Sequence, residues 1–204
     1  KDFDFFLGRC SSGTLGDFSE IILPERKEGN KGQFFRKYRE GSDYEAAITS
    51  FRTFEPLRSL FYFFRERVFP FTGISEKRLI VGAKACDLRA LSVLDKALVN
   101  DDFVDPAYKA WRDSTVIVAA DCEEIAETCH CVLFDGKPYA ESGADAVMST
   151  SGDSWLINSL TDRGLEFLDL IKDTTETKHS GKAEDSEVAK NRQAMVERLE
   201  KQNE

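Results

Sequence analysis

The chain has 204 residues, a formal net charge of −9 and a hydrophobic fraction of 41%. That length and apolar content are enough for a core that folds without disulfides. The excess of acidic residues argues against nucleic acids and anionic membrane surfaces as partners, because both attract a basic face. No stretch of the sequence approaches the roughly 20 apolar residues of a membrane span, and no signal-like segment opens it, so we expect a cytoplasmic protein.

Residues 1–54 carry no sustained hydrophobic period, and we expect short strands and loops in this less regular part. From Glu55 onward apolar side chains recur at helical spacing until Pro70 ends the run. This pattern predicts a buried amphipathic helix whose aromatic stripe faces the core. Its apolar positions are Leu57, Leu60, Phe61, Phe64 and Val68.

Two strand–helix units follow. Residues 78–83 form a continuous apolar run that predicts a buried strand, and the leucine pattern behind it predicts a helix with Asp87 as its N-cap. Asp105 and Pro106 then mark the start of a short helix that ends near Arg112. Residues 115–120 predict a second buried strand.

Beyond the cysteines the alternation continues, with short strands expected at 139–141, 144–149 and 155–160 and a helix capped by Thr161. This order predicts an α/β domain over residues 1–173, with a mixed or largely parallel sheet flanked by helices. Residues 174–204 are polar and charged, which predicts a linker and an exposed, charged C-terminal helix. The chain begins at Lys1 and ends in this charged run, so we expect it to be part of a longer protein.

Four of the five cysteines lie in one block of the sequence. Cys86 and Cys122 each follow a predicted buried strand, and Cys129 and Cys131 lie shortly after Cys122. Ligands gather at the carboxyl ends of parallel strands, so two neighbouring strands would turn Cys86 and Cys122 toward one pocket. The loop from Cys122 to Cys131 can fold back to bring the other two thiols into it. Cys10 has no local partner, and we expect it to be buried.

Four thiolates shielded by apolar strands suit an iron–sulfur cluster, and tetrahedral zinc accepts the same set. The spacing lacks the C-x2-C steps of common ferredoxins and zinc ribbons. Plain burial explains Cys86 as well as ligation does, whereas Cys129 and Cys131 in a polar loop have no packing rationale. His130 could act as a ligand or as a hydrogen-bond donor to a cluster sulfur, although solvent exposure is the ordinary state of a loop histidine.

Other chemistries have less support in the sequence. Cys129 and Cys131 could form a transient disulfide or carry sulfur, which would be a thiol-redox function. A docking role, with zinc or free thiols and an acidic face at Glu123, Glu124 and Glu127, is a further alternative. No nucleophile elbow or glycine-rich phosphate loop is present, so hydrolysis and nucleotide binding by those routes are not indicated. Nothing speaks directly for a flavin in the same crevice, and nothing excludes one.

Several motifs in residues 78–164 together resemble one family of electron-transfer subunits. The family comprises the iron–sulfur beta subunits of sulfhydrogenase-type nickel–iron hydrogenases and the corresponding iron–sulfur subunits of anaerobic sulfite reductase. The motifs are Gly82-Ala-Lys-Ala-Cys86-Asp87-Leu-Arg89, Leu94-Asp95, Asp105-Pro106-Ala-Tyr108, Arg112, Cys122, Glu127-Thr128-Cys129-His130-Cys131, Gly143-Ala-Asp145 and residues 155–164.

The resemblance implies an α/β domain joined to a C-terminal ferredoxin-type module with two four-iron clusters, of which this chain holds only the first part. By position, Cys86, Cys122, Cys129 and Cys131 match the thiols of the family's first domain and would bind one 4Fe-4S cluster. The family has an aromatic residue where this chain has His130. The implied function is electron transfer without catalysis, in a cytoplasmic oxidoreductase complex of the hydrogenase or the sulfite or sulfur reductase type. The implied partners are a catalytic subunit, with flavin or iron–sulfur subunits.

Overall fold

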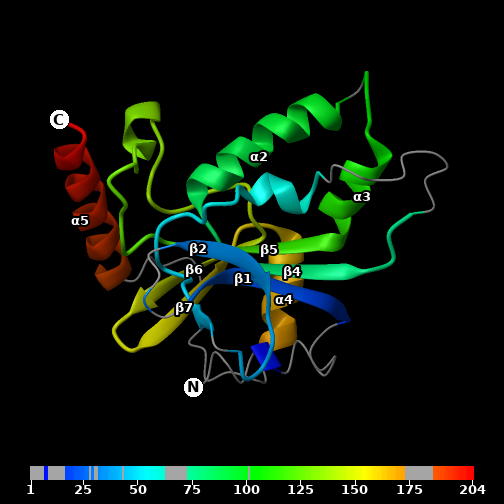
Figure 1. The fold of residues 1–204 in the computed structure, drawn as a ribbon, viewed down its shortest axis with the longest axis horizontal. Helices are drawn as coiled ribbons and strands as arrows, with labels where there is room; N and C mark the ends of the chain where they lie inside the picture. Colours follow the sequence, from blue (N-terminus) through cyan, green and yellow to red (C-terminus); the bar gives the residue numbers. More distant parts are fainter. Residues whose placement is uncertain are drawn as a thin grey trace.

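The computed structural model describes residues 7–8, 17–27, 29, 32–42, 44–62, 73–100, 102–172 and 186–204. Seven strands in these ranges form one sheet in the order β2-β1-β4-β5-β6-β7, with β3 paired to the outer part of β1 (Figure 1). The four central strands β1, β4, β5 and β6 run parallel, and β2, β3 and β7 are antiparallel to their neighbours. The predicted α/β class with a mixed sheet is therefore confirmed. The strands are β1 Phe18–Lys27, β2 Gln33–Lys37, β3 Tyr44–Ala46, β4 Lys77–Ala83, β5 Thr115–Ala120, β6 Ala146–Ser151 and β7 Ser154–Ser159.

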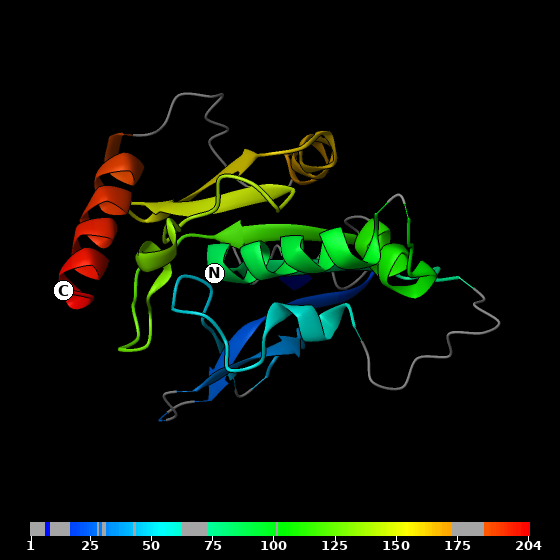
Figure 2. The same ribbon diagram turned by 90° about the horizontal axis from the view of Figure 1, so that it is seen from above.

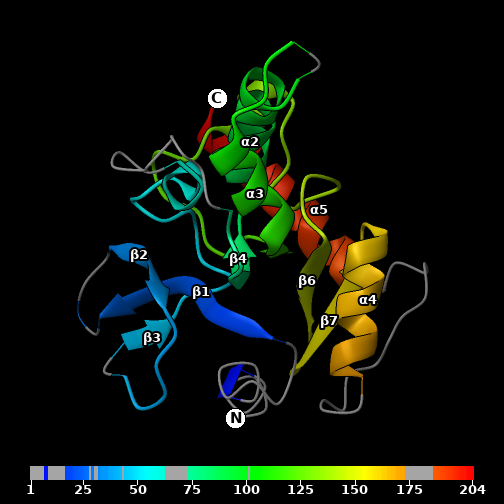
Figure 3. The same ribbon diagram turned by 90° about the vertical axis from the view of Figure 1, so that its right-hand side faces the viewer.

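Helices lie on both faces of the sheet, as Figure 3 shows end-on. Helices α2 and α3 and the 3-10 turn η1 cover one face, α4 covers the other, and α5 stands at the end of the sheet beside η2 (Figure 2). No helix in the described ranges is long and apolar enough to cross a membrane. The helical elements are η1 Leu57–Leu60, α2 Ala85–Leu98, α3 Pro106–Ser114, η2 Cys131–Phe134, α4 Asp162–Ile171 and α5 Ser186–Gln202.

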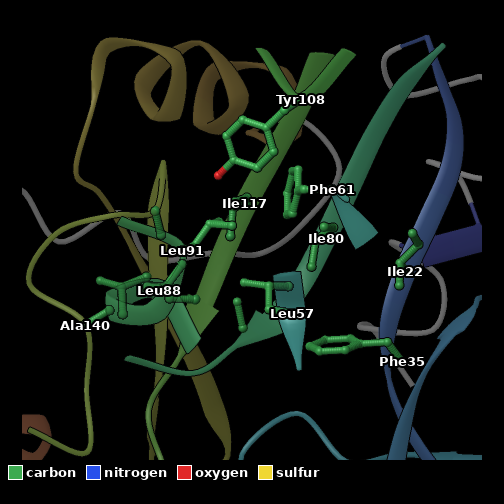
Figure 4. Packing of buried hydrophobic residues seen from close by; sticks show 14 residues of the cluster. Ile22, Phe35, Leu57, Phe61, Ile80, Leu88, Leu91, Tyr108, Ile117 and Ala140 are labelled. Carbon is green, nitrogen blue, oxygen red and sulfur yellow. The ribbon is translucent and has the colours of Figure 1, made fainter. Parts of the chain in front are cut away.

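The face under α2 and α3 buries more aromatic side chains than the other face does. Leu88 and Leu91 of α2 and Tyr108 of α3 pack with Phe61 on the strand residue Ile117 and its neighbours (Figure 4). Phe61 and Tyr108 are 0% exposed. Burial of large apolar side chains stabilises such a core by about 2 kcal/mol each relative to exposure, so this layer fixes α2, and with it the start of that helix, on the sheet.

Several predicted boundaries are confirmed. β4 and β5 match the two predicted buried strands, Asp105 caps α3 through its side chain, and Thr161 caps α4 by accepting from Gly164 N. The predicted strand at 139–141 is wrong, because those residues form bends between η2 and β6. Of the helix predicted from Glu55 to Pro70, the described residues 55–62 form only the 3-10 turn at Leu57–Leu60, and residues 63–70 lie outside the described residues.

The predicted N-cap of α2 is also wrong. The helix begins at Ala85 with Lys84 in the cap position, which places Asp87 inside the first turn. Asp87 instead turns toward a tertiary partner, because its Oδ1 accepts from the backbone N–H of Leu57 at 3.5 Å. The carboxylate still lies near the helix N-terminus, where negative charge is favoured.

Asp145 joins three elements on the side of the sheet near α4. Its carboxylate accepts from the backbone N–H of Ile117 in β5 at 2.9 Å and from the hydroxyl of Thr161 at 3.0 Å. Arg163 binds the same carboxylate through Nε at 2.9 Å and Nη2 at 3.1 Å. A Cβ on Gly164 would lie 1.9 Å from the carbonyl oxygen of Asp145, so only glycine permits this close approach.

We expect Asp145→Ala to lower the free energy of unfolding by about 3 kcal/mol, because it leaves the buried N–H of Ile117 without an acceptor and Arg163 without its partner. Asp169→Ala is the matched control, since Asp169 is exposed and forms a long ion pair with Lys172; it should change stability by less than about 0.5 kcal/mol. Urea unfolding of both variants measures the difference, and equal losses would contradict the role given to Asp145.

Candidate cysteine site

The predicted pocket requires β4 and β5 to be neighbours, and they are. The two strands pair in parallel, with Ile80 opposite Ile117. Cys86 lies in the first turn of α2, just past the end of β4, and Cys122 lies two residues past the end of β5. Both thiols are thus at the carboxyl edge of the sheet, where ligands of parallel sheets collect.

Gly82 shapes the end of β4. Its φ is +86°, and the register of β4 against β5 shifts between Val81 and Ala83. A Cβ at this position would lie 2.9 Å from the Pro24 ring of β1. The glycine therefore allows both the close approach of β1 and the irregular strand end that leads into α2.

The loop after Cys122 is held by backbone hydrogen bonds to two other segments. Cys122 N donates to Pro138 O at 2.8 Å, and Glu123 N donates to Thr49 O at 2.7 Å. A tight turn follows, in which Cys129 N donates to Ala126 O at 2.9 Å and Ala126 N donates to the Sγ of Cys129 at 3.3 Å. The loop thus already contains one N–H···S hydrogen bond of the kind that stabilises a thiolate.

The thiols of this corner influence one another electrostatically. The pKa of Cys86 is raised to about 12, chiefly by desolvation although its side chain reaches the surface, and the nearby Asp87 and Cys122 contribute to this shift. Burial raises the pKa of Cys122 to about 11, with Cys129 and Cys131 adding to the shift. Burial and Cys129 likewise raise the pKa of Cys131. Without a metal these three thiols are therefore neutral near pH 7.

Lys84 is the buried cation of this corner. It is 2% exposed, and its Nζ donates to the carbonyl oxygens of Ile48, of Asp121 at 3.2 Å and of Ala120 at 3.4 Å. Burial lowers the pKa of Lys84, and the negative charges of Cys122 and Asp121 oppose that shift. Lys84 was not among the predicted site residues, although a lysine between a buried strand and Cys86 was a visible signal.

The four cysteines lie at the same edge of the sheet but do not form a complete metal site. In the part of the chain that the structure describes, no group of three or more His, Cys, Asp and Glu side chains is arranged to hold a metal ion. Cys122, Cys129 and Cys131 are partly buried and Cys86 is exposed, and all four are free thiols. Cys10 lies outside the described residues.

His130 lies at the surface of the loop. Its side chain is exposed, its Nδ1 donates to the carbonyl oxygen of Thr128 at 2.6 Å, and its ring packs edge-on against Phe134 at 5.7 Å. A metal-binding histidine also donates its other ring N–H to a carbonyl in this way, so these contacts fit both the ligand role and the ordinary loop histidine.

Helix α5 is the part of the site that sequence reasoning did not find. We expected residues 186–204 to be exposed, but Val188 and Leu199 are 2% and 1% exposed, and the helix lies against η2 and the end of β6. Figure 1 shows it in red beside the loops that carry the cysteines. Val188, Met195 and Leu199 recur at helical spacing, but this signal was outweighed by the polar and charged composition of the segment.

Comparisons of the chain with protein-family models, with curated proteins and with solved structures found no match. The local geometry and the residue types therefore carry the functional argument.

The raised pKa of Cys122 has a measurable consequence for the metal-free chain. Between about pH 9 and pH 11 the unfolded chain has lost the Cys122 proton while the folded chain keeps it, so the folded state loses stability as the pH rises through this window. In Cys122→Ala this contribution is absent. We expect the native chain to lose more unfolding free energy between pH 8 and pH 10.5 than Cys122→Ala loses.

Alkylation gives an independent measurement of the same group. At pH 8 a thiol with a pKa of about 11 has a thiolate fraction about 100-fold below that of an unperturbed thiol with a pKa of 9.0. Iodoacetamide should therefore modify Cys122 slowly at pH 8 and much faster above pH 10, as followed by peptide mass spectrometry. Fast modification at pH 8 would contradict a desolvated thiol.

Proposed function

We propose that this chain is an electron-transfer domain of a cytoplasmic oxidoreductase complex and binds a 4Fe-4S cluster through Cys86, Cys122, Cys129 and Cys131. The observation that supports the proposal is that Cys86 and Cys122 follow the adjacent parallel strands β4 and β5 at one edge of the sheet, with Cys129 and Cys131 close enough to Cys122 to influence its pKa. The resemblance of residues 78–164 to the electron-transfer subunits of hydrogenases and sulfite reductases supports iron over zinc.

The chemistry of the surroundings fits such a cofactor. Thiolates are the ligands of iron–sulfur clusters, and a bound cluster would take up and release single electrons. The ammonium of Lys84, held at the end of β4, would offset part of the negative charge of the thiolates. The N–H of Ala126 would continue to donate to Cys129 Sγ, a type of contact that tunes the potential of such groups. Loop 122–131 has to close further on Cys86 for all four sulfurs to bind one cluster.

One side of this corner is open to a partner. Cys86 is exposed, and Leu133 and Phe134, next to Cys131 in the chain, are each 61% exposed. An apolar tip at a redox site suits contact with another electron-transfer group, because exposed large apolar residues are typical of interaction sites. The partners in this proposal are a catalytic subunit, flavin or iron–sulfur subunits, and a ferredoxin-type module attached to this chain.

The thiol-redox alternative is weaker. Attack on a disulfide or on sulfur requires a thiolate, and reactive cysteines lie in surroundings that lower their pKa. Here burial raises the pKa of Cys86, Cys122 and Cys131. Zinc held by the same four thiolates, in a docking domain without electron transfer, remains the second candidate, because four thiolates at one corner suit it equally.

Anaerobic reconstitution with iron and sulfide tests the proposal. We expect about four iron and four sulfide ions per chain, with a brown chromophore and a paramagnetic signal on reduction. Replacing any one of the four cysteines by serine should reduce the retained iron at least severalfold, because each iron loses its sulfur ligand.

Cys10→Ser serves as the matched control and should retain the cluster. A colourless protein that holds about one zinc per chain by elemental analysis, with no iron retained, would establish the docking alternative instead.

A further inference from the structure

Helix α5 is anchored next to Cys122 by an ion pair. Arg192 binds Asp121 through Nε at 2.8 Å and Nη2 at 3.2 Å, and Nη2 also donates to Ser149 Oγ at 3.3 Å. Its guanidinium lies 4.4 Å from the centre of the Tyr139 ring. Bidentate, charge-assisted pairs of this kind are short and geometrically specific, so α5 has a fixed position relative to the end of β5.

The C-terminal end of α5 reaches the turn that carries Cys129. Gln202 Nε2 donates to Ala126 O at 3.1 Å and to Cys129 O at 3.2 Å. Asn203 Nδ2 donates to Cys129 O at 3.2 Å and to Leu199 O, in the last turn of α5, at 2.7 Å. Two carboxamides thus converge on one carbonyl oxygen, and Asn203 ties it directly to the helix.

Along the middle of α5, apolar packing against the strand ends is incomplete. A partly open pocket of about 400 Å³ lies along this part of the helix, with Cys122, Tyr139, Asn191, Met195 and Arg198 among its lining residues. Dispersion contacts are missing across the pocket, so polar contacts contribute to the position of the helix. The helix is therefore attached chiefly at Arg192, at its two buried apolar residues and at its C-terminal carboxamides.

We propose that Gln202 and Asn203 are positioning residues of the cysteine site, because they fix the Cys129 carbonyl and so hold the 126–129 turn in the conformation that presents Cys129 toward Cys122. The role in cluster binding that we give these two residues rests on the proposed function. That they fix the Cys129 carbonyl is a statement about the metal-free chain itself. Neither residue touches the thiols. They act through the backbone of Cys129 and make α5 part of the site.

The test removes the donors without changing side-chain shape. Gln202→Glu with Asn203→Asp replaces both NH2 groups by oxygens, which repel the Cys129 carbonyl. The matched control, Gln193→Glu, makes the same kind of chemical change on the same helix at an exposed position that lies outside the pocket lining and away from the turn. The measured quantity is the ratio of iodoacetamide modification rates of Cys129 and Cys86 in the reduced, metal-free chain.

We expect this ratio to differ at least about fivefold from that of the native chain in the Gln202/Asn203 variant, the factor that corresponds to one net hydrogen bond, and to stay unchanged in the control. Cys86 serves as the internal reference, because general loosening of the fold would raise both rates together. A ratio equal to that of the native chain overturns the proposal.

Iron retention separates this inference from the proposed function. If the native chain takes up a cluster, the Gln202/Asn203 variant should release its iron to a chelator at least severalfold faster than the control does. A chain with Gln202→Asn alone, which keeps the NH2 donor, should release iron at a rate between those of the variant and the control. Equal release rates in the variant and the control would count against the positioning role. If the native chain takes up no iron, the proposed function fails, while the alkylation ratio still decides whether α5 positions Cys129.

Discussion

The parallel pairing of β4 with β5 is the constraint on which the cysteine site depends. It ends both strands at one edge of the sheet, and the two cysteines that follow them share that edge. Lys84 then joins the strand ends, because its Nζ donates to carbonyls of the β5 end and of Ile48. A buried ammonium requires such acceptors, so the sheet edge and the segment around Ile48 are held together by the same group that lies beside the thiols.

Many residues of the family-like motifs have structural roles away from the cysteines. Asp95 in α2 binds Arg112 in α3 through two hydrogen bonds of 2.9 Å and accepts from the hydroxyl of Tyr108 at 2.6 Å. Asp145 similarly joins β5 to the start of α4 through Arg163. These two networks set how helices pack on the sheet. The likeness in those motifs therefore bears on the fold, and the inference about chemistry depends on the cysteines alone.

The features that could be predicted from the sequence are those that local physics determines. Continuous apolar runs predicted β4 and β5, and the side-chain caps Asp105 and Thr161 predicted two helix starts, because caps act within a few residues. The N-cap of α2 was wrong because Asp87 has a tertiary partner, the N–H of Leu57. The return of α5 could not be predicted for the same reason, since its contacts join residues more than seventy positions apart.

Lys84 and helix α5, which we did not predict as parts of the site, both affect its charge. Their raised pKa values keep Cys86 and Cys122 protonated in the metal-free chain, whereas cluster ligands must be thiolates. Binding would therefore release protons and place several negative charges at a desolvated corner. Lys84 supplies a positive charge there, and α5 brings a second one, Arg192, which neutralises Asp121 next to Cys122. Without that pairing the Asp121 carboxylate would repel a Cys122 thiolate, so in the proposed cluster-bound state α5 would act through charge as well as through the position of the Cys129 turn.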